Sequence, residues 1–507
     1  MKELCMLFIQ LGFHTEYPDS STAATTYNDG IYYVASFVKR EFPSARIDMC
    51  QMMWNQHPRD FPIEDYDYIF ISALATQFWS NIETLQSMRD RMKEGATAVM
   101  GGPHAAFAPY EALKFVDYVI LGEGEVPAVQ LIEAIEQKSD LDEVDNLCYI
   151  GDTGKLVMNK FARYGNFEIQ IDPELLKGAP KLHWATVSMS RGCPFNCSFC
   201  YAIRLLGRKF RTKNVQHIRA ELDGIYRETG CKRFYVTDLN FPTRKDFCYE
   251  VADAVHDAGY KFIAMSRIDL ADNVDLLLRL KEAGFEEYCL GVESEDPSAL
   301  DIFNKKVDPS LQTKRLHTFA EHDIYIHSAI IYGLDEQDAA AIRRTARWCA
   351  EARIVHPTFV CLAEYPFQNL LFGSRQDVED HRIIMGVPTY QHYSFVGMFP
   401  RHMRPSELQQ LIAESYEIFF KRAFEIEKRP QRRVRLKMYS RSIDQSLPGM
   451  RKHIAFLKEF ERPYYTKDGI LKEQMLVDEF EEKYGDMRKW LSQVEKRDLA
   501  FDKNYSR

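Results

Sequence analysis

Three cysteines, Cys193, Cys197 and Cys200, follow one another with the spacing C-x3-C-x2-C. Three thiolates on one loop can bind three iron corners of a cubane 4Fe-4S cluster and leave the fourth iron open to another ligand. Structural zinc is the alternative interpretation, but a closed zinc site takes four ligands, commonly as two pairs. Because the sequence has no second C-x2-C motif and no His pair, the triad predicts a cluster.

The cysteines come directly after an apolar run, residues 183–189, that predicts a β-strand. Strand and helix patterns then alternate to about residue 362. Further strands are expected at residues 233–237, 261–266, 287–292, 324–331 and 358–362, with helices at 215–229, 246–258, 274–283 and 339–352. Six parallel strands with outer helices predict a partial (β/α)6 barrel of the TIM type, whose active site lies at the carboxyl ends of its strands.

The first 130 residues also alternate between strand and helix patterns, as in a doubly wound parallel sheet. Expected strands are residues 5–11, 46–52, 68–74, 98–100 and 118–121, and expected helices are 31–41, 81–94 and 109–115. Five strands in this rhythm predict a flavodoxin-like (Rossmann-type) order. The ligand crevice of such a sheet lies beyond the carboxyl ends of its strands.

Small residues occupy two of those strand ends. Ser72 and Leu74 follow the third strand, Gly101 and Gly102 follow the fourth, and 26 residues separate Leu74 from Gly101. This spacing resembles the S-x-L-x26-G-G pattern of cobalamin-binding domains, in which the serine and the glycines make room for the buried nucleotide tail. Glycine suits this role because it has no Cβ to obstruct a ligand. Glu123, in the Gly-Glu-Gly-Glu run after the fifth strand, is a further expected cobalamin contact.

Cobalamin-binding domains usually also carry D-x-H-x-x-G, whose His coordinates cobalt from below. Here Thr25 replaces the Asp, Tyr27 replaces the His, and Gly30 matches the glycine. The resemblance therefore implies cobalamin bound without a His ligand, with Tyr27 in the ligand's place. A degenerate domain that has lost its ligand is the alternative. His104, which follows the glycine pair, is expected to cap a loop or contact the tail.

The barrel and its cysteine loop resemble the radical S-adenosylmethionine superfamily, in the branch with an amino-terminal cobalamin-binding domain. The resemblance implies that the three cysteines hold the cluster while S-adenosylmethionine chelates the open iron through its amino and carboxylate groups. It also implies S-adenosylmethionine contacts from an aromatic residue before the last cysteine and from polar residues at strand ends. The corresponding residues are Phe199, Asp238, Ser266, Arg267 and Glu293.

Each strand-end residue also has a plain alternative, which is a solvent-exposed or salt-bridged side chain in a loop. Arg267 is suited to a carboxylate because its guanidinium is a planar fork, and Glu293 lies in a family-like Gly-x-Glu. Residues 332–336 resemble the family's Gly-x-Pro-Gly-Glu turn without its Pro and second Gly, and residues 365–367 with Gly373 resemble a substrate-facing loop.

The expected domains are a cobalamin-binding domain at 1–135, a linker at 136–180, the barrel at 181–365 and a mostly helical region at 366–507. At 507 residues and 46% hydrophobic content, the chain can bury several cores. Eleven cysteines without regular pairing and the lack of a signal sequence predict a cytoplasmic protein. No apolar run is long enough to span a bilayer.

The net charge of −9 argues against a general nucleic-acid binder. A basic run at 421–441 could attract an anionic substrate, a membrane surface or a partner, although a charge run is more often a solvated helix face. Residues 405–461 show helical apolar spacing at Leu408, Leu411, Ile412 and Tyr416.

The resemblance implies a methyltransferase that methylates an unactivated carbon of a small molecule or natural product through a 5′-deoxyadenosyl radical. Its cofactors would be the 4Fe-4S cluster, S-adenosylmethionine and His-off cobalamin, with an external one-electron reductant of the flavodoxin or ferredoxin type. Oxidative cyclisation or ring rearrangement without methyl transfer stays an alternative, because the family includes both. A non-catalytic cobalamin sensor is disfavoured by the triad. The sequence identifies no substrate-side catalytic residue.

Overall fold

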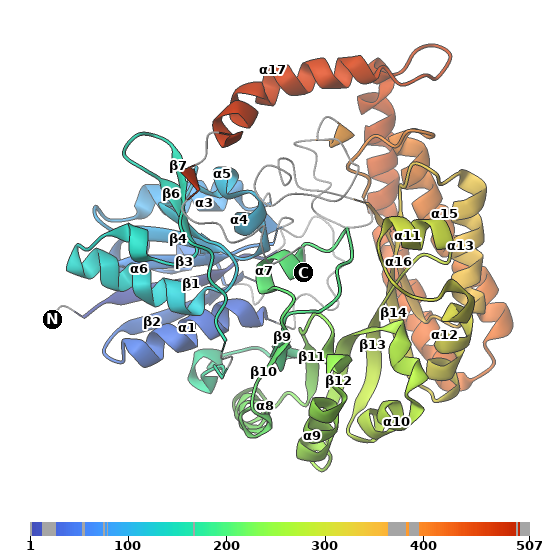
Figure 1. Cartoon of the computed structure of the whole chain (residues 1–507), viewed down its shortest axis with the longest axis horizontal. Coiled ribbons are helices and arrows are strands. Elements are labelled where there is room, and N and C mark those ends of the chain that lie inside the picture. Colours follow the sequence, from blue (N-terminus) through green and yellow to red (C-terminus); the bar gives the residue numbers. More distant parts are fainter. Residues whose placement is uncertain are drawn as a thin grey trace.

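The computed structural model describes residues 3–12, 27–52, 56–74, 77–78, 80–165, 168–362, 382–384, 395–492 and 495–496. A sheet domain, a barrel and a group of helices follow one another along the chain, and the last long helix returns across the top (Figure 1). Within these residues, no helix has the length and apolar character needed to cross a membrane.

The sheet domain contains the five parallel strands expected from the sequence. They are β1 (Cys5–Gln10), β2 (Arg46–Gln51), β3 (Tyr68–Ser72), β4 (Thr97–Gly101) and β5 (Tyr118–Ile120). Their order, β2-β1-β3-β4-β5, confirms the flavodoxin-like prediction. The helices of this domain are α1 (Asp29–Glu41), α3 (Ile82–Arg91), α4 (Pro103–Phe107), α5 (Pro109–Ala112) and α6 (Glu125–Gln137).

The two faces of this sheet belong to different cores. Leu7, Ile9 and Ile71 face α3, α4 and α5 in one apolar cluster. Phe8 and Phe70 lie on the other face with α1 and α6, in a cluster that continues into the barrel. Tyr33 of α1 takes part in this continuity, because it is buried and its hydroxyl accepts a hydrogen bond from the Ser188 N–H after the first barrel strand. The sheet domain and the barrel therefore share one core.

The region expected as a linker also contributes to the sheet. β6 (Leu147–Ile150) pairs antiparallel with β5, and β7 (Leu156–Met158) pairs antiparallel with β6. At the far edge, β16 (Glu495–Lys496) pairs in parallel with β7. The chain thus brings its carboxyl-terminal segment back to its first sheet. The domain boundaries themselves stay predictions.

The second sheet has six parallel strands in the order β15-β14-β13-β12-β11-β8, which agrees with a partial barrel. Its strands are β8 (Ala185–Val187), β11 (Arg233–Val236), β12 (Lys261–Arg267), β13 (Phe285–Glu293), β14 (Tyr325–Tyr332) and β15 (His356–Cys361). Its helices are α8 (Val215–Thr229), α9 (Lys245–Val255), α10 (Val274–Glu282), α11 (Pro297–Ile302), α12 (Gln312–Glu321) and α13 (Ala339–Glu351).

The cysteine loop leaves the first barrel strand through a short antiparallel pair. β9 (Ser190–Arg191) pairs with β10 (Arg211–Thr212), and α7 (Ala202–Leu206) lies within the loop that they close. Gly192 opens this loop with a φ of +86°, and a Cβ there would lie 2.2 Å from the Lys209 carbonyl oxygen. Glycine is therefore required at the position before Cys193.

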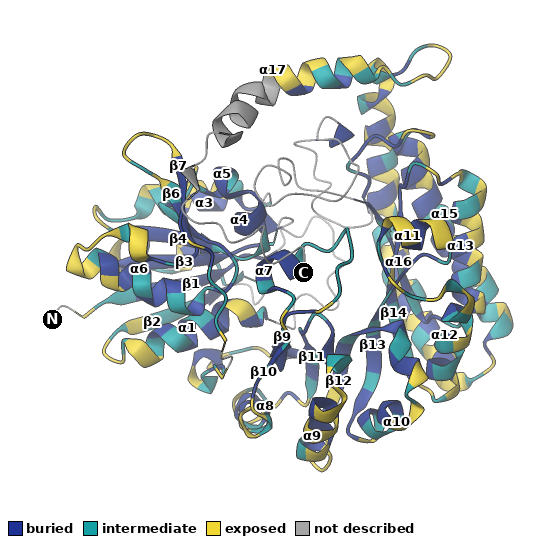
Figure 2. Ribbon diagram, in the orientation of Figure 1, coloured by how far each residue is buried: buried dark blue, intermediate teal, exposed yellow. Residues whose placement is uncertain are grey.

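Three helices complete the fold, namely α15 (Pro405–Ile426), α16 (Pro430–Phe460) and α17 (Glu473–Ser492). The four apolar residues expected to share one helix face are all buried on α15, namely Leu408, Leu411, Ile412 and Tyr416. Figure 2 shows α16 with a buried side toward the barrel and exposed residues elsewhere. The helical prediction for 405–461 is thus confirmed.

The basic run extends from the end of α15 through the turn into α16, and part of it is structural. The Arg432 side chain is 1% exposed, with its Nε 3.0 Å from Glu427, and it donates to the carbonyl oxygens of Ile324 and Arg353. Arg435 forms an ion pair with Glu287 of β13. Arg432 and Arg435 bind α16 to the barrel. The interpretation of the basic run as a solvated helix face is therefore wrong for these two residues.

Arg432→Ala is expected to lower the free energy of unfolding by about 3 kcal/mol, because it removes the donor to the buried carbonyl oxygens of Ile324 and Arg353 and one of the arginines that pair with buried Glu427. Urea unfolding followed by circular dichroism measures this change. Lys437→Ala on the exposed side of the same helix is the control and is expected to leave the midpoint unchanged. Equal midpoints for the two variants would contradict the structural role.

Candidate active site

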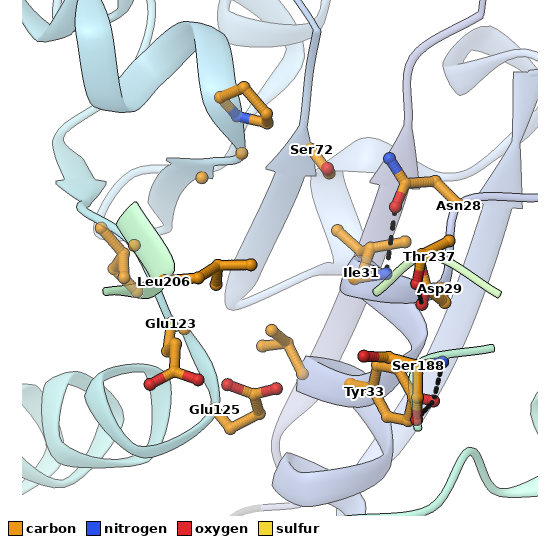
Figure 3. A pocket seen from close by; sticks show the side chains of 18 of the residues that line it. Asn28, Asp29, Ile31, Tyr33, Ser72, Glu123, Glu125, Ser188, Leu206 and Thr237 are labelled. Atoms are coloured by element: carbon orange, nitrogen blue, oxygen red, sulfur yellow. Dashed lines mark hydrogen bonds between the residues drawn. The ribbon is translucent and has the colours of Figure 1, made fainter. Parts of the chain in front are cut away.

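A hollow of about 260 Å³ lies between the sheet domain and the barrel. Its walls come from the ends of β3, β4 and β5, from the first turn of α1, and from the first barrel strands (Figure 3). Ser72, Gly101, Gly102 and Glu123, four of the predicted cobalamin contacts, all line it. We call it the interdomain pocket.

Glycine is required at one point of this wall. Gly102 has a φ of +90°, and a Cβ there would lie 2.9 Å from the carbonyl oxygen of Ala73 and 3.2 Å from the Ser72 Oγ. The nearest atom to a Cβ at Gly101 would be 3.9 Å away. The turn after β4 can therefore press against the end of β3 only because residue 102 has no side chain.

Tyr27 and Leu74 are placed differently from the other predicted cobalamin contacts. Neither lines the interdomain pocket. Tyr27 is 2% exposed and its hydroxyl donates to the Thr186 carbonyl oxygen at 3.0 Å. Leu74 donates its backbone N–H to Gln77. Thr25, which replaces the Asp of the D-x-H-x-x-G pattern, lies outside the described residues.

Two further carboxylates of the pocket bind the barrel. Asp29 in the first turn of α1 accepts a hydrogen bond from the Thr237 hydroxyl at 2.6 Å, and burial raises the pKa of this carboxyl. Glu125 contacts Arg191 at 2.5 Å, and Glu123 contacts both Arg191 and Arg211. Figure 3 shows the two glutamates on the same side of the pocket. No sequence motif indicated that these groups pair across the domains.

The three cysteines lie on the loop that begins at the pocket wall. Cys193 is buried, and Cys197 and Cys200 are half-buried. Burial raises the pKa of Cys193 and brings the pKa of Cys200 to about 11, and the charge of Cys197 acts on both. The thiols are thus electrostatic neighbours. In the described part of the chain, no three His, Cys, Asp or Glu side chains converge as ligands of a single ion.

Cations face the cysteine loop from the barrel. Arg267, at the end of β12, packs its guanidinium 3.8 Å from the centre of the Phe195 ring, and it donates to the carbonyl oxygens of Lys305 and Lys306. Lys305 Nζ lies 2.8 Å from Glu293 and 5.6 Å from the centre of the Phe199 ring. The structure thus brings three of the residues predicted at this site, Phe199, Arg267 and Glu293, together around Lys305.

Lys305 is a residue that the sequence analysis missed. A Cβ at Gly291 would lie 2.5 Å from its Nζ and 2.9 Å from the Glu293 Oε1, so the glycine of Gly-x-Glu makes room for this ion pair. Glu293 itself has a φ of +65°, a conformation that carries strain in a residue with a side chain. The Gly-x-Glu motif was the sequence signal for this site. Lys305, the partner of Glu293, lies twelve residues further along the chain.

The other two predicted strand-end residues, Asp238 and Ser266, bind protein groups next to the cysteine loop. Asp238 accepts hydrogen bonds from the Met189 N–H and from the Ser190 hydroxyl, and burial raises its pKa to about 6. Ser266 donates to the Arg267 carbonyl oxygen. A fully buried ion pair also joins Lys213 and Glu221 at 2.5 Å. Their contacts are with the protein, on strands that lead into the site.

His104 lies in the core of the sheet domain. Its ring stacks on Phe78 with centroids 3.9 Å apart, it is fully buried, and burial lowers its pKa to about 3. Asp335, of the Gly-x-Pro-Gly-Glu-like turn, contacts Arg382 and Arg401. The predicted substrate-facing residues 365–367 and 373 lie outside the described residues.

Comparison with known proteins agrees with both halves of this arrangement. Residues 21–132 match the B12 binding domain, and residues 187–349 match the Radical SAM superfamily. A B12-binding domain and, after it, a radical SAM domain are therefore both present in the chain. The family prediction made from the cysteine and glycine motifs is confirmed.

Relatives of this radical SAM chain carry names of two kinds. A Pyrococcus horikoshii protein named an uncharacterized methyltransferase is 23% identical, over 78% of this chain and 87% of that protein. Hopanoid C-3 methylase of Methylococcus capsulatus is 28% identical, over 53% of each chain. The anaerobic magnesium-protoporphyrin IX monomethyl ester cyclase of Cereibacter sphaeroides is 25% identical, over 70% of this chain and 60% of the cyclase.

The fold has solved counterparts. The cobalamin-dependent S-adenosylmethionine radical enzyme OxsB, with aqua-cobalamin and S-adenosylmethionine bound, superimposes with a TM-score of 0.63. The superposition covers 96% of this chain and 76% of OxsB at 15% sequence identity. The radical SAM chain therefore shares its arrangement of sheet domain, barrel and carboxyl-terminal helices.

The residues present suit the cofactors of such a protein. The interdomain pocket lies beyond the ends of β3, β4 and β5, which is where a flavodoxin-like sheet binds its ligand. In the cysteine loop, which follows Arg191, three neighbouring thiols suit an anionic cluster. The cations Arg267 and Lys305 beside the loop suit a carboxylate ligand. The B12-binding and radical SAM domains thus account for cobalamin, the 4Fe-4S cluster and S-adenosylmethionine.

Gly102→Ala is expected to weaken cobalamin binding at least about tenfold, because the new Cβ meets backbone atoms and the left-handed φ adds strain. Visible absorbance after gel filtration measures the bound cofactor. Gly95→Ala is the control, since Gly95 has a φ of +78° but no atom within 4 Å of a Cβ. Equal binding by the two variants would show that the close contact at Gly102 is unimportant.

Proposed function

We propose that this protein is a cobalamin-dependent radical SAM methyltransferase that methylates an unactivated carbon of a small molecule or natural product. The observation that supports the proposal most strongly is a shared wall. Arg191 lines the interdomain pocket, and the first cysteine of the cluster motif follows it by two residues. A cofactor in the pocket and a cluster on the loop would therefore act on one substrate space.

On the barrel side, we assign Cys193, Cys197 and Cys200 to three irons of the cluster. Phe199 is proposed to contact the adenine of S-adenosylmethionine, and the cations of Arg267 and Lys305 are suited to its carboxylate. Arg267 also has a second role, because it fixes the backbone carbonyls of the Lys305 turn. Asp238, Ser266 and Glu293 complete the proposed set.

On the sheet side, Ser72, Leu74, Gly101, Gly102 and Glu123 are proposed to hold cobalamin, with no His ligand below cobalt. The Tyr27 hydroxyl donates to the Thr186 carbonyl oxygen and lies outside the pocket lining, which argues against a role as a cobalt ligand. When bound, the cluster and S-adenosylmethionine supply a radical that abstracts hydrogen from carbon, and cobalamin supplies a methyl carrier.

Burial of the site is part of the proposed mechanism. Radical chemistry needs a space from which water is excluded, and the groups around the cysteine loop are packed accordingly. Lys305, Glu293 and Arg267 are each 5% exposed. Their ion pairs and hydrogen bonds hold charged atoms in fixed positions next to the loop, so they need no reorganisation when a charged ligand enters.

A second candidate function is radical chemistry without methyl transfer, such as an oxidative cyclisation. It is favoured by one observation, which is the similarity to a magnesium-protoporphyrin IX monomethyl ester cyclase over 70% of this chain. We place it second because relatives named as methyltransferases include the one that is covered over 87% of its length.

The proposed partners are a small-molecule substrate and an external one-electron reductant of the flavodoxin or ferredoxin type. Radical SAM enzymes as a class need both a substrate and a source of electrons. We also propose a cytoplasmic location, since eleven thiols without regular pairing suit a reducing compartment.

Incubation of the reduced, cofactor-loaded protein with methyl-labelled S-adenosylmethionine and a small-molecule extract separates the two functions. Methyl transfer is expected to yield S-adenosylhomocysteine together with 5′-deoxyadenosine, and to place label in a product. Mass spectrometry of the mixture measures all three. 5′-Deoxyadenosine without S-adenosylhomocysteine or labelled product would instead support the cyclase-type reaction.

Cys197→Ala is expected to abolish both the cluster absorption near about 400 nm and the release of 5′-deoxyadenosine, because one iron loses its thiolate. Cys5→Ala serves as the control, since Cys5 is half-buried like Cys197 but lies in β1. Turnover that persists in Cys197→Ala would refute the catalytic assignment.

A further inference from the structure

Two arginines lie directly opposite each other where the cysteine loop closes. Arg191 of β9 and Arg211 of β10 are partners in the antiparallel register. Everything between them, residues 192–210, forms the loop that carries the three cysteines and α7. Like charges facing each other across two strands repel, so opposite charges nearby are needed to make this short pair favourable.

The compensating charges come from the other domain. Glu123 lies 2.9 Å from Arg191 and 2.8 Å from Arg211, and Glu125 lies 2.5 Å from Arg191. The four side chains are between 2% and 11% exposed. We call them the ion quartet. Its net charge is zero, and it joins the turn after β5 to the base of the cysteine loop.

The quartet also extends to the rest of the loop. Arg211 donates to the carbonyl oxygen of Leu206 at the end of α7 at 2.9 Å. Burial alone would lower the pKa of Arg191, but Glu125 and Glu123 outweigh it and raise the pKa instead. The pairing therefore stabilises the buried charges, and opening of the loop would have to separate them.

Three members of the quartet, Glu123, Glu125 and Arg191, line the interdomain pocket, and Leu206 lines it beside them. Separated charges need water, because an unpaired ion in a low-dielectric interior is strongly unfavourable. An empty pocket can supply that water to an opening quartet. A ligand that fills the pocket packs against Glu123, Glu125 and Arg191 and leaves these side chains no room to separate on that side, so the filled pocket makes loop opening more costly.

We propose that Arg191 is a positioning residue that couples the interdomain pocket to the cysteine loop, so that bound cobalamin protects the 4Fe-4S cluster from loss. This inference rests on the proposed cobalamin and cluster sites. Because binding energies are linked reciprocally, the loaded cluster should also strengthen cobalamin binding. The coupling requires the Arg191–Glu125 contact and not merely contact between the domains.

Iron release to a coloured chelator, under anaerobic conditions and without substrate, tests the coupling independently of catalysis. The cluster-loaded protein is compared with and without hydroxocobalamin. In the unaltered chain, hydroxocobalamin is expected to slow iron release about tenfold, within the range usual for linked sites. In Arg191→Met and in Glu125→Gln, the slowing is expected to fall below about twofold.

Lys39→Met is the matched control. Lys39 also bridges the sheet domain to a distant segment, with its Nζ 2.7 Å from Asp172, but neither residue lines the pocket. This variant is expected to keep the tenfold effect. A full tenfold effect in Arg191→Met or Glu125→Gln would overturn the proposal, and so would its loss in Lys39→Met.

Arg191→Lys covers the case in which Arg191→Met does not load a cluster. It keeps one positive charge but loses the two-pronged contact with both glutamates, so an intermediate protection is expected and full protection would overturn the proposal. Absorbance first establishes whether hydroxocobalamin binds the unaltered chain. If it does not bind, the proposed function fails too. If it binds without slowing iron release, only the coupling fails.

Discussion

Burial of charge is the constraint on which this structure depends most. Arg191 and Arg211 face each other at the base of the cysteine loop, and the glutamates of the sheet domain form the salt bridges that neutralise them. A buried, unpaired charge costs several kcal/mol, about as much as the net stability of a domain. The radical SAM barrel therefore cannot present its cluster loop in this form without the sheet domain.

The same constraint acts at other places that matter for the site. Lys305 pairs with Glu293 beside the cysteine loop, Lys213 pairs with Glu221 beneath it, and Arg432 pairs with Glu427 where α16 meets the barrel. In each pair a charge is buried because a precise partner is present. Such pairs add less to stability than apolar contacts of equal volume, but they fix positions, and positions are what a radical reaction needs.

Much of the fold could be predicted, because periodicity is a local property of the chain. The five strands of the sheet domain and the six of the barrel lie within a few residues of their expected positions, and the order β2-β1-β3-β4-β5 follows from their rhythm. Residues 136–180 were harder, since β6 and β7 are short antiparallel additions. Arg432 was hidden in a basic run because sequence alone does not say which arginine faces a carboxylate.

The sequence by itself determined the chemistry that the chain can attempt. The cysteine spacing, the serine and glycine pattern and the missing His are all short-range features, and they led to the family. Only the tertiary structure decided what the charged and phenolic groups do. Tyr27 binds Thr186, Glu123 binds two arginines, and Lys305 binds Glu293. These partners are distant in sequence, and a buried ion or hydroxyl takes whichever partner the fold brings within about 3 Å.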